Sequence, residues 1–229
     1  MRRCLVLFSR DPEAEARTKR LPGSEPVFAT TLARVARAAE EAGFELLVAG
    51  RAARALPKAT AVRQRGITFG ERLCNALTDA RGLGYEQVFV VPGDVPGLNG
   101  RTLLSAARAL EQAAVVAGPS PDGGIYLLGL RGVSLDWIAS VRWRTASVFQ
   151  DVCRAACALG VAVLPVLADL DRARDLDRLA CDHRLDPELR RLIGRARLAS
   201  RPPSRHGIRP VGRTLGGPAP VRGPPSPAL

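Results

Sequence analysis

The sequence predicts an α/β fold in which a mostly parallel sheet is covered by helices on both faces. Short apolar runs alternate along most of the chain with longer segments whose apolar residues recur at helical spacing. The run Val88–Val91 is apolar at consecutive positions, which is typical of a strand buried on both faces of a parallel sheet. Together these observations indicate three layers, α/β/α.

Most of the predicted strands are short clusters of apolar residues, many of them β-branched, that end at polar, glycine or proline residues. In chain order they are Cys4–Phe8, Glu45–Ala49, Ala61–Gln64, Val88–Val91, Ala114–Ala117, Ile125–Leu130 and Val161–Leu167. The polar segment Ser9–Glu25 is predicted to be a loop. Its length is unusual for a connection in such folds, which makes it a candidate functional segment.

The helices are predicted from apolar residues three and four positions apart and from signals at their ends. They are Val27–Ala42, Phe69–Ala80, Arg101–Ala113, Thr145–Leu159, Asp175–Ala180 and Pro187–Leu198. The first should stop at Gly43, because glycine favours helix termination. Thr145 is the expected N-cap of its helix. Trp143, just before it, belongs either to the wall of a cleft or to the core.

The basic charge of the chain is concentrated at its C-terminal end. The net charge is +12, but nine of the 34 basic residues and none of the 22 acidic ones lie from Arg190 onward, which leaves 25 basic residues against those 22. Residues 200–229 are rich in Pro, Gly and Arg, so we expect one domain, residues 1–199, and a disordered tail. A basic tail without interleaved aromatic residues disfavours a nucleic-acid partner.

The cysteines and the apolar segments indicate the cellular compartment in which the protein is expected. Five scattered cysteines, without a histidine or second cysteine pair at zinc-site spacing, argue against both a disulfide framework and a zinc site. The N-terminal apolar run is too short for a secretory signal. No stretch approaches the ~18 apolar residues of a membrane helix. We therefore expect a cytoplasmic protein without a membrane partner.

The predicted strand Val88–Val91 leads into Pro92-Gly93-Asp94-Val95-Pro96. In open α/β sheets ligands bind beyond the carboxyl ends of the strands, so Asp94 lies where a metal ion or a phosphorylated substrate is expected. Alternatively, Asp94 only caps the helix that follows. This segment by itself is equally consistent with both interpretations.

Three cations, Arg17, Lys19 and Arg20, lie within four positions of the first loop. Arginine offers a planar fork and lysine a point charge, so together they could neutralise a diphosphate. Lys19 is of particular interest because Lys58 is the only other lysine. The alternative is a solvent-exposed basic loop.

Further acidic residues follow two other predicted strands. Asp122-Gly123-Gly124 is either the turn of a hairpin or a place where a ligand approaches the backbone, with Asp122 accepting hydrogen bonds from it. Asp169 and Asp171 would point the same way if the last strand persists there, and carboxylate oxygens suit Mg²⁺ or Mn²⁺. Alternatively, they cap the next helix.

The sequence excludes several enzyme classes. It holds no Walker A motif and no Gly-x-Gly-x-x-Gly after the first strand. The Gly-x-Ser-x-Gly elbow of α/β hydrolases is also missing, and the two histidines, His183 and His206, both lie near the C-terminal end. A P-loop NTPase, a dinucleotide-binding Rossmann domain and a Ser-His-Asp hydrolase are therefore not supported.

Seven segments, in this order, resemble a family of GT-A-like transferases known as arsenosugar-biosynthesis-type glycosyltransferases. This family is related to the molybdenum-cofactor and 2-phospholactate guanylyltransferases. The matching segments are Leu5–Arg10, Thr18–Leu21, Phe69–Leu73, Gly93–Leu98, Gly118–Leu127, Val141–Thr145 and Asp169–Asp171. The resemblance spans residues 4 to 180, and the ordered series is more specific than any one segment.

The resemblance implies a nucleotide-diphospho-sugar transferase fold. It implies that Asp94 is the metal-binding carboxylate and that Lys19 and Arg20 belong to a loop facing the phosphates. The residues of the matched segments that are expected to bind substrate are Arg10, Gly93, Pro96, Gly123, Gly124 and Trp143.

Two departures from the family pattern affect this expectation. Where the family has Pro-Gly before its basic residues, this chain has the segment 12–16, Pro-Glu-Ala-Glu-Ala. The Asp-x-Asp of many glycosyltransferases is Asp94-Val95-Pro96 here, so a second metal ligand must come from elsewhere. Asp122 or Asp171 could supply it.

The leading hypothesis is a metal-dependent glycosyltransferase that uses a nucleotide-sugar donor and a small-molecule acceptor. Asp94 and Asp171 would hold Mg²⁺ or Mn²⁺, the basic loop would compensate phosphate charge, and Asp122 would orient the acceptor. One alternative is a nucleotidyltransferase that uses a nucleoside triphosphate and a phosphorylated small molecule. Others are a non-catalytic nucleotide-sugar-binding module and a protein tethered to nucleic acid by its tail.

Overall fold

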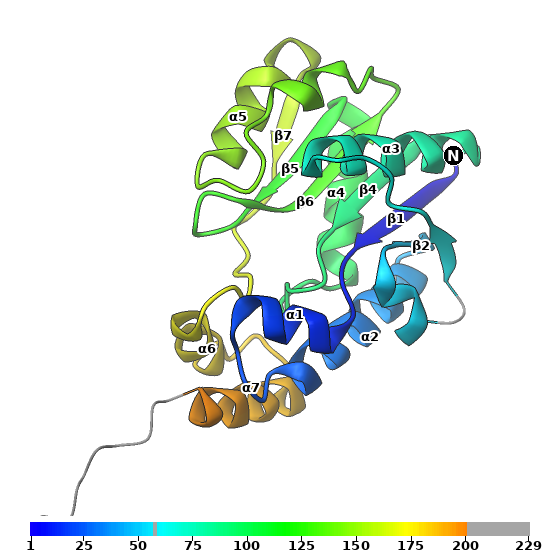
Figure 1. Ribbon diagram of the computed structural model, residues 1–229. Coiled ribbons are helices and arrows are strands. Elements are labelled where there is room, and N and C mark those ends of the chain that lie inside the picture. The colour runs from blue at the N-terminus through cyan, green and yellow to red at the C-terminus, as the bar shows by residue number, and fades with distance from the viewer. Residues whose placement is uncertain (57–58, 201–229) are drawn as a thin grey trace, which may run out of the picture.

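The computed structural model describes residues 1–56 and 59–200 and contains a seven-stranded sheet (Figure 1). The strand order is β3-β2-β1-β4-β6-β5-β7. The strands are β1 Arg3–Phe8, β2 Glu45–Ala49, β3 Thr60–Val62, β4 Gln87–Val91, β5 Val115–Pro119, β6 Ile125–Arg131 and β7 Val161–Val163. Only β6 runs antiparallel to its neighbours, β4 and β5, within the described residues. The predicted mostly parallel sheet is confirmed.

Helices cover both faces of this sheet, as predicted. They are α1 Pro12–Lys19, α2 Glu25–Glu41, α3 Phe69–Gly82, α4 Gly100–Gln112, α5 Val148–Ala155, α6 Ala173–Ala180 and α7 Pro187–Ala199. Helices α2 and α4 pack on one face, and α3 and α5 on the other. Helices α1, α6 and α7 lie together beyond one end of the sheet (Figure 1).

The core follows from the two-residue period of the strands. In β1, Leu5 and Leu7 pack with α2 and α4, whereas Cys4 and Val6 pack with α3 and α5. All four are fully buried. Because both faces of the strand are covered, its sequence is continuously apolar.

A separate apolar cluster joins α1, α2, α6 and α7. It includes Leu21 and Phe28 from the N-terminal part of the chain and Leu176 and Ile193 from the C-terminal helices, all buried. This packing brings the segment before α6 next to α1, at the end of the sheet where β1 and β4 finish.

The prediction of a loop over Ser9–Glu25 was wrong in part, because α1 forms within it. Asp11 caps this helix by accepting a hydrogen bond from the Ala14 backbone N–H at 2.8 Å. Proline at the first helical position is also favourable. The helix ends at Arg20, which adopts the left-handed region with φ 56°.

Two other elements are shorter than predicted. Helix α5 begins after Ser147, because the Thr145 hydroxyl donates to the Arg142 carbonyl at 2.8 Å and does not cap the helix. A short 3₁₀ helix, Cys157–Leu159, follows α5. Strand β7 stops at Val163, close to Pro165, which has no N–H to continue a ladder.

The predicted disordered tail lies outside the described residues, except for Ser200, which ends α7. In the part of the chain that the structure describes, no helix combines the length and apolar character needed to cross a membrane.

Two glycines, one in the sheet and one in helix α7, differ in how closely other atoms surround them. A Cβ at Gly129 in β6 would lie 2.5 Å from Val116 Cγ1 and 2.6 Å from Phe89 Cδ1. We expect Gly129→Ala to lower the free energy of unfolding by about 1–3 kcal/mol, because the core must shift to admit the methyl group. In α7, a Cβ at Gly194 meets no atom of the described part of the chain within 4 Å. Gly194→Ala should therefore raise the free energy of unfolding by about 0.5–1 kcal/mol, because alanine is favoured over glycine inside a helix. Denaturant unfolding measures both, and equal effects would contradict this packing.

Candidate functional site

A cleft of about 700 Å³ opens at the carboxyl ends of the parallel strands. Its walls come from the segments after β1 and β4, from α1 and α3, and from the segments before α5 and α6. Because β6 is antiparallel, its first residue, Ile125, also lies at this edge. This is the position at which ligands are expected in open α/β sheets.

The ammonium group of Lys19 lies among carboxylates at this edge. Its Nζ forms ion pairs with Asp94 Oδ2, with Asp171 Oδ1 at 2.6 Å and with Glu15 Oε1 at 3.4 Å. It also donates to the Leu170 carbonyl at 2.8 Å. The Lys19 side chain is only 10% exposed. Lys19 therefore connects α1 to the segment after β4 and to the segment before α6.

Lys19 remains charged in this environment. Burial alone lowers the pKa of a lysine, but the carboxylates of Asp94, Asp171 and Glu15 raise the pKa of Lys19 above its ordinary value. The buried ammonium group is therefore positively charged at neutral pH. Its charge compensates the negative charge of the carboxylates around it.

Asp94 does not cap a helix. The N-cap of α4 is Asn99, whose side chain accepts from the Thr102 backbone N–H at 3.1 Å. The Asp94 carbonyl instead accepts from the Leu170 N–H at 2.8 Å. Its carboxylate contacts Lys19 through Oδ2, while Oδ1 is buried without a hydrogen-bond partner among the residues that the structure describes.

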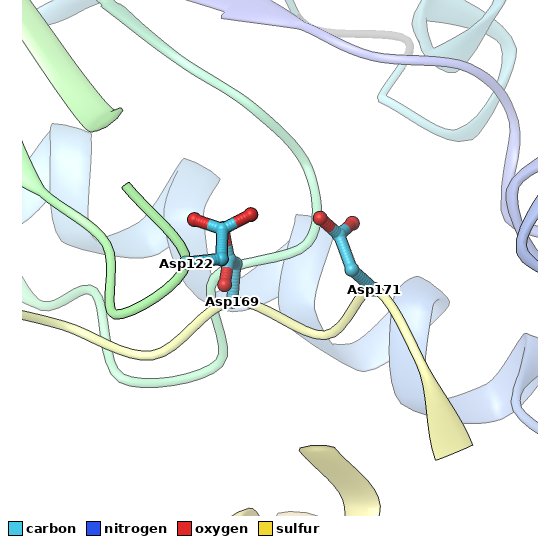
Figure 2. A group of neighbouring side chains, drawn as sticks. All are labelled: Asp122, Asp169 and Asp171. Atoms are coloured by element: carbon cyan, nitrogen blue, oxygen red, sulfur yellow. The ribbon is translucent and has the colours of Figure 1, made fainter. Parts of the chain in front are cut away.

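Asp122, Asp169 and Asp171 form what we call the acidic cluster, in which one carboxylate oxygen of each lies within 4.8 Å of the others. Figure 2 shows Asp122 on the turn after β5 and the other two on the segment that leads to α6. The N-cap of α6 is Arg172, and the Asp175 carboxylate accepts from the backbone N–H groups of Arg172 at 2.8 Å and Asp171 at 3.1 Å. The carboxylates of Asp169 and Asp171 are therefore not the caps of α6.

The acidic cluster is electrostatically crowded. Burial, followed by the nearby carboxylates of Asp94, Asp122 and Asp171, raises the pKa of Asp169 to about 7. The donors are all oxygens, the set that Mg²⁺ and Mn²⁺ prefer. A divalent cation would offset the repulsion among these carboxylates, so these residues fit such an ion.

Arginines supply positive charge around the cleft, but not all of the predicted ones do. The lining arginines are Arg10, Arg72, Arg144, Arg172 and Arg174. Arg17 is paired with Glu13 at 3.3 Å, and neither it nor Arg20 lines the cleft. Of residues 17–20 at the end of α1, only Thr18 and Lys19 therefore line the cleft.

Aromatic residues form one side of the cleft. Trp143 lines it, is partly buried and also packs against the core beside α3 and α5, so it has both of the predicted positions. Its ring lies 5.6 Å from that of Phe69, and its Nε1 donates to the Ile138 carbonyl at 3.0 Å. The neighbouring Arg144 has a positive φ of 65°, which is unusual for a residue with a side chain.

The predicted substrate-binding glycines and Pro96 have different surroundings. Gly93 lines the cleft, but a Cβ there would lie 2.1 Å from Ser9 Oγ, so close packing against the end of β1 already requires glycine. Pro96 is buried and does not line the cleft. Gly124 lines the cleft, and Gly123, with φ +90°, packs against the Ala146 carbonyl. The turn at these two glycines is the predicted hairpin between β5 and β6.

Sequence reasoning did not identify Glu15, Arg72, Arg144, Arg172 or Arg174 as site residues. Glu15 lies one helical turn before Lys19 in α1. That spacing is visible in the sequence, but it has meaning only once residues 12–19 are recognised as a helix. The arginines come from segments whose approach to the cleft depends on tertiary packing.

Comparisons with known proteins agree with this architecture. The profile of a family described as "Uncharacterized protein conserved in bacteria (DUF2064)" matches residues 18–145. No curated protein matches the sequence.

Solved structures show the same fold. A Desulfovibrio desulfuricans G20 protein, provisionally described as a nucleotide-diphospho-sugar transferase, is 23% identical, with a TM-score of 0.72 over 86% of this chain and 99% of that one. A CMP:2-keto-3-deoxy-manno-octonic acid synthetase complexed with CTP is 13% identical, with a TM-score of 0.54 over 85% and 99%. Rv0371c from Mycobacterium tuberculosis H37Rv, in complex with manganese, is 18% identical, with a TM-score of 0.54 over 78% and 97%. The nucleotide-diphospho-sugar transferase fold predicted from the resemblance is confirmed.

Asp169 should make the stability of the metal-free protein depend on pH. The unfolded carboxyl group titrates near pH 4, whereas the folded one keeps its proton up to about pH 7. Its contribution to the free energy of unfolding therefore falls as the pH rises from about 4 to about 7. Because asparagine resembles the protonated form, Asp169→Asn should match the parent protein at low pH and unfold at a higher temperature at pH 8.

Thermal unfolding in the presence of a chelator measures this effect. Asp136→Asn is the control, since Asp136 is exposed and lies outside the cleft lining. Parallel pH profiles for the parent protein and Asp169→Asn would contradict the raised pKa.

Proposed function

The chain belongs to the DUF2064 family of uncharacterized proteins conserved in bacteria, and from its site we propose that it is a metal-dependent transferase acting on a nucleotide-sugar. One observation carries the proposal: an acidic cluster faces a cleft, lined by arginines, at the carboxyl edge of the sheet. Carboxylates suit a divalent cation and arginines suit phosphate oxygens, so this cleft fits a metal-bound diphosphate.

Asp122, Asp169 and Asp171 would hold Mg²⁺ or Mn²⁺. When bound, such an ion would neutralise the diphosphate of the donor and stabilise it as a leaving group. The prediction that Asp94 is also a metal ligand competes with its contact to Lys19, which occupies Oδ2. Asp122 is the exposed member of the acidic cluster, so a role in orienting the acceptor remains part of the proposal.

The side chains that line the cleft would divide the remaining tasks. Arg10, Arg144 and Arg172 would bind phosphate oxygens by charge-assisted hydrogen bonds. Trp143 and Phe69 offer an apolar surface against which a ring of the substrate can pack. The acceptor hydroxyl would then attack the anomeric carbon as the nucleoside diphosphate leaves.

Nucleotidyl transfer is the second candidate, since the same groups would serve it. A phosphorylated acceptor would attack the α-phosphate of a nucleoside triphosphate, and pyrophosphate would leave. Among the proteins that share this fold, the CMP:2-keto-3-deoxy-manno-octonic acid synthetase was solved with CTP, which makes triphosphates reasonable members of a test panel.

Product analysis separates these reactions. The protein is incubated with Mn²⁺, with panels of nucleotide-sugars and nucleoside triphosphates, and with sugar and phosphorylated acceptors. Release of a nucleoside diphosphate from a nucleotide-sugar supports glycosyl transfer, and release of pyrophosphate from a triphosphate supports nucleotidyl transfer. Metal-dependent binding without turnover would indicate a binding module. Absence of any metal-dependent binding would overturn the proposal.

Removal of one carboxylate from the acidic cluster should impair metal binding. We expect Asp169→Asn to weaken Mn²⁺ binding at least about tenfold in a calorimetric titration, because one of three oxygen ligands becomes a neutral amide. Asp177→Asn is the matched control, since Asp177 is an exposed carboxylate on α6 outside the cleft lining. Equal Mn²⁺ affinities of the two variants would place the ion elsewhere.

Arg144 should bind the nucleotide rather than stabilise the fold. Arg144→Gly relieves a positive φ, so we expect unchanged or higher thermal stability. Loss of a charge-assisted hydrogen bond should weaken nucleotide binding about tenfold or more. Arg20→Gly makes the same backbone change at φ 56° outside the cleft lining, and nucleotide affinity should not change. The opposite order of effects would assign phosphate binding to Arg20.

A further inference from the structure

The position of Lys19 suggests a function other than phosphate binding. A lysine ammonium has three N–H donors. In this structure three oxygens lie close to Nζ: it donates hydrogen bonds to Asp94 Oδ2 and the Leu170 carbonyl, and it forms an ion pair with Asp171 Oδ1 at 2.6 Å. A phosphate oxygen could gain a donor from Lys19 only by displacing one of them.

We propose that Lys19 is a built-in cation: its ammonium group occupies, between Asp94 and Asp171, the place that a second divalent ion would otherwise take. The inference rests on the proposed function for its metal site at the acidic cluster. With Lys19 in this position, the cleft binds a single metal ion. The charge of the carboxylates next to Lys19 is then neutralised by the chain itself.

The surroundings of Lys19 are those of a cation site. Oxygens surround Nζ from three parts of the chain: Glu15 on α1, Asp94 after β4, and Leu170 and Asp171 before α6. Carboxylates and a backbone carbonyl are the oxygen ligands that hard cations take in proteins. Here a point charge on a flexible stem fills that position.

The placement of Lys19 is fixed by elements on both sides. It lies in the last turn of α1, where a positive charge interacts favourably with the helix dipole. Glu15 precedes it by one turn and also pairs with Arg10 at 3.2 Å. Lys19 Nζ also lies 5.5 Å from the centre of the Phe28 ring. Phe28 belongs to the buried cluster of α1, α2, α6 and α7.

Asp171 connects the two cation positions. It pairs with Lys19 at 2.6 Å and also belongs to the acidic cluster. Lys19 therefore acts as a positioning residue, because it orients Asp171 toward the proposed metal. Asp94 is then the counter-ion of Lys19 and not a metal ligand. The phosphate charge is left to the arginines that line the cleft.

Metal stoichiometry tests this inference. Mn²⁺ is titrated calorimetrically into the parent protein, Lys19→Ala, Lys19→Arg and Asp94→Asn. We expect one ion per chain for the parent protein, two for Lys19→Ala, and one for Lys19→Arg, which keeps the charge. Asp94→Asn should still bind one ion, with an affinity changed less than about threefold, because it removes no metal ligand. A loss of purely structural support would not create a second site.

A further variant covers the case in which Lys19→Ala does not fold. Lys19→Ala combined with Asp94→Asn removes one charge of each sign, and it should bind one ion because the second site lacks a carboxylate. Loss of Mn²⁺ binding in Asp94→Asn, or a folded Lys19→Ala that binds no more ions than the parent protein, would overturn the inference.

Failure of the proposed function gives a different result. If the parent protein binds no Mn²⁺ but Lys19→Ala binds one ion, the acidic cluster is not a metal site, yet Lys19 still occupies a cation position. If the parent protein binds one ion and Lys19→Ala also binds one, the proposed function stands and the role of Lys19 is wrong.

Discussion

The contacts of the Lys19 ammonium with Asp94, Asp171 and Leu170 hold the functional edge of this fold together. Without this charge, carboxylates from α1, from the segment after β4 and from the segment before α6 would repel one another in a partly buried place. Removing one partner of a buried ion pair costs several kcal/mol, because it leaves the other charge uncompensated. Lys19 therefore stabilises the approach of these three segments, together with the hydrogen bond from the Leu170 N–H to the Asp94 carbonyl.

A second constraint is the reversal of β6. Because it runs antiparallel between β4 and β5, the turn from β5 brings Asp122 back to the edge at which the parallel strands end. The acidic cluster thus combines one residue of a local hairpin with two residues that arrive some 50 positions later in the chain. Packing of α6 and α7 against α1 and α2 sets the distance between these parts.

Most of the fold could be predicted from the sequence, since the pattern of buried strands and amphipathic helices is local. Residues 12–19 were missed because their composition is polar, although Asp11 and the proline after it are helix-start signals. In the site, Asp94, Lys19, Asp122 and Asp171 were recognised from their positions after strands. The pairing of Lys19 with Asp94 was not, because spacing along the chain does not show which opposite charges meet. Cleft arginines such as Arg72 were missed for the same reason.

The late position of Asp169 and Asp171 has a consequence for synthesis and turnover of the protein. The seven strands in the described part of the chain all precede these residues, so a ribosome has produced that sheet before the acidic cluster can assemble. A chain cut by a protease between β7 and Asp169 retains every described strand but lacks two of the three carboxylates. Such a fragment could keep much of its secondary structure and yet have no complete cleft.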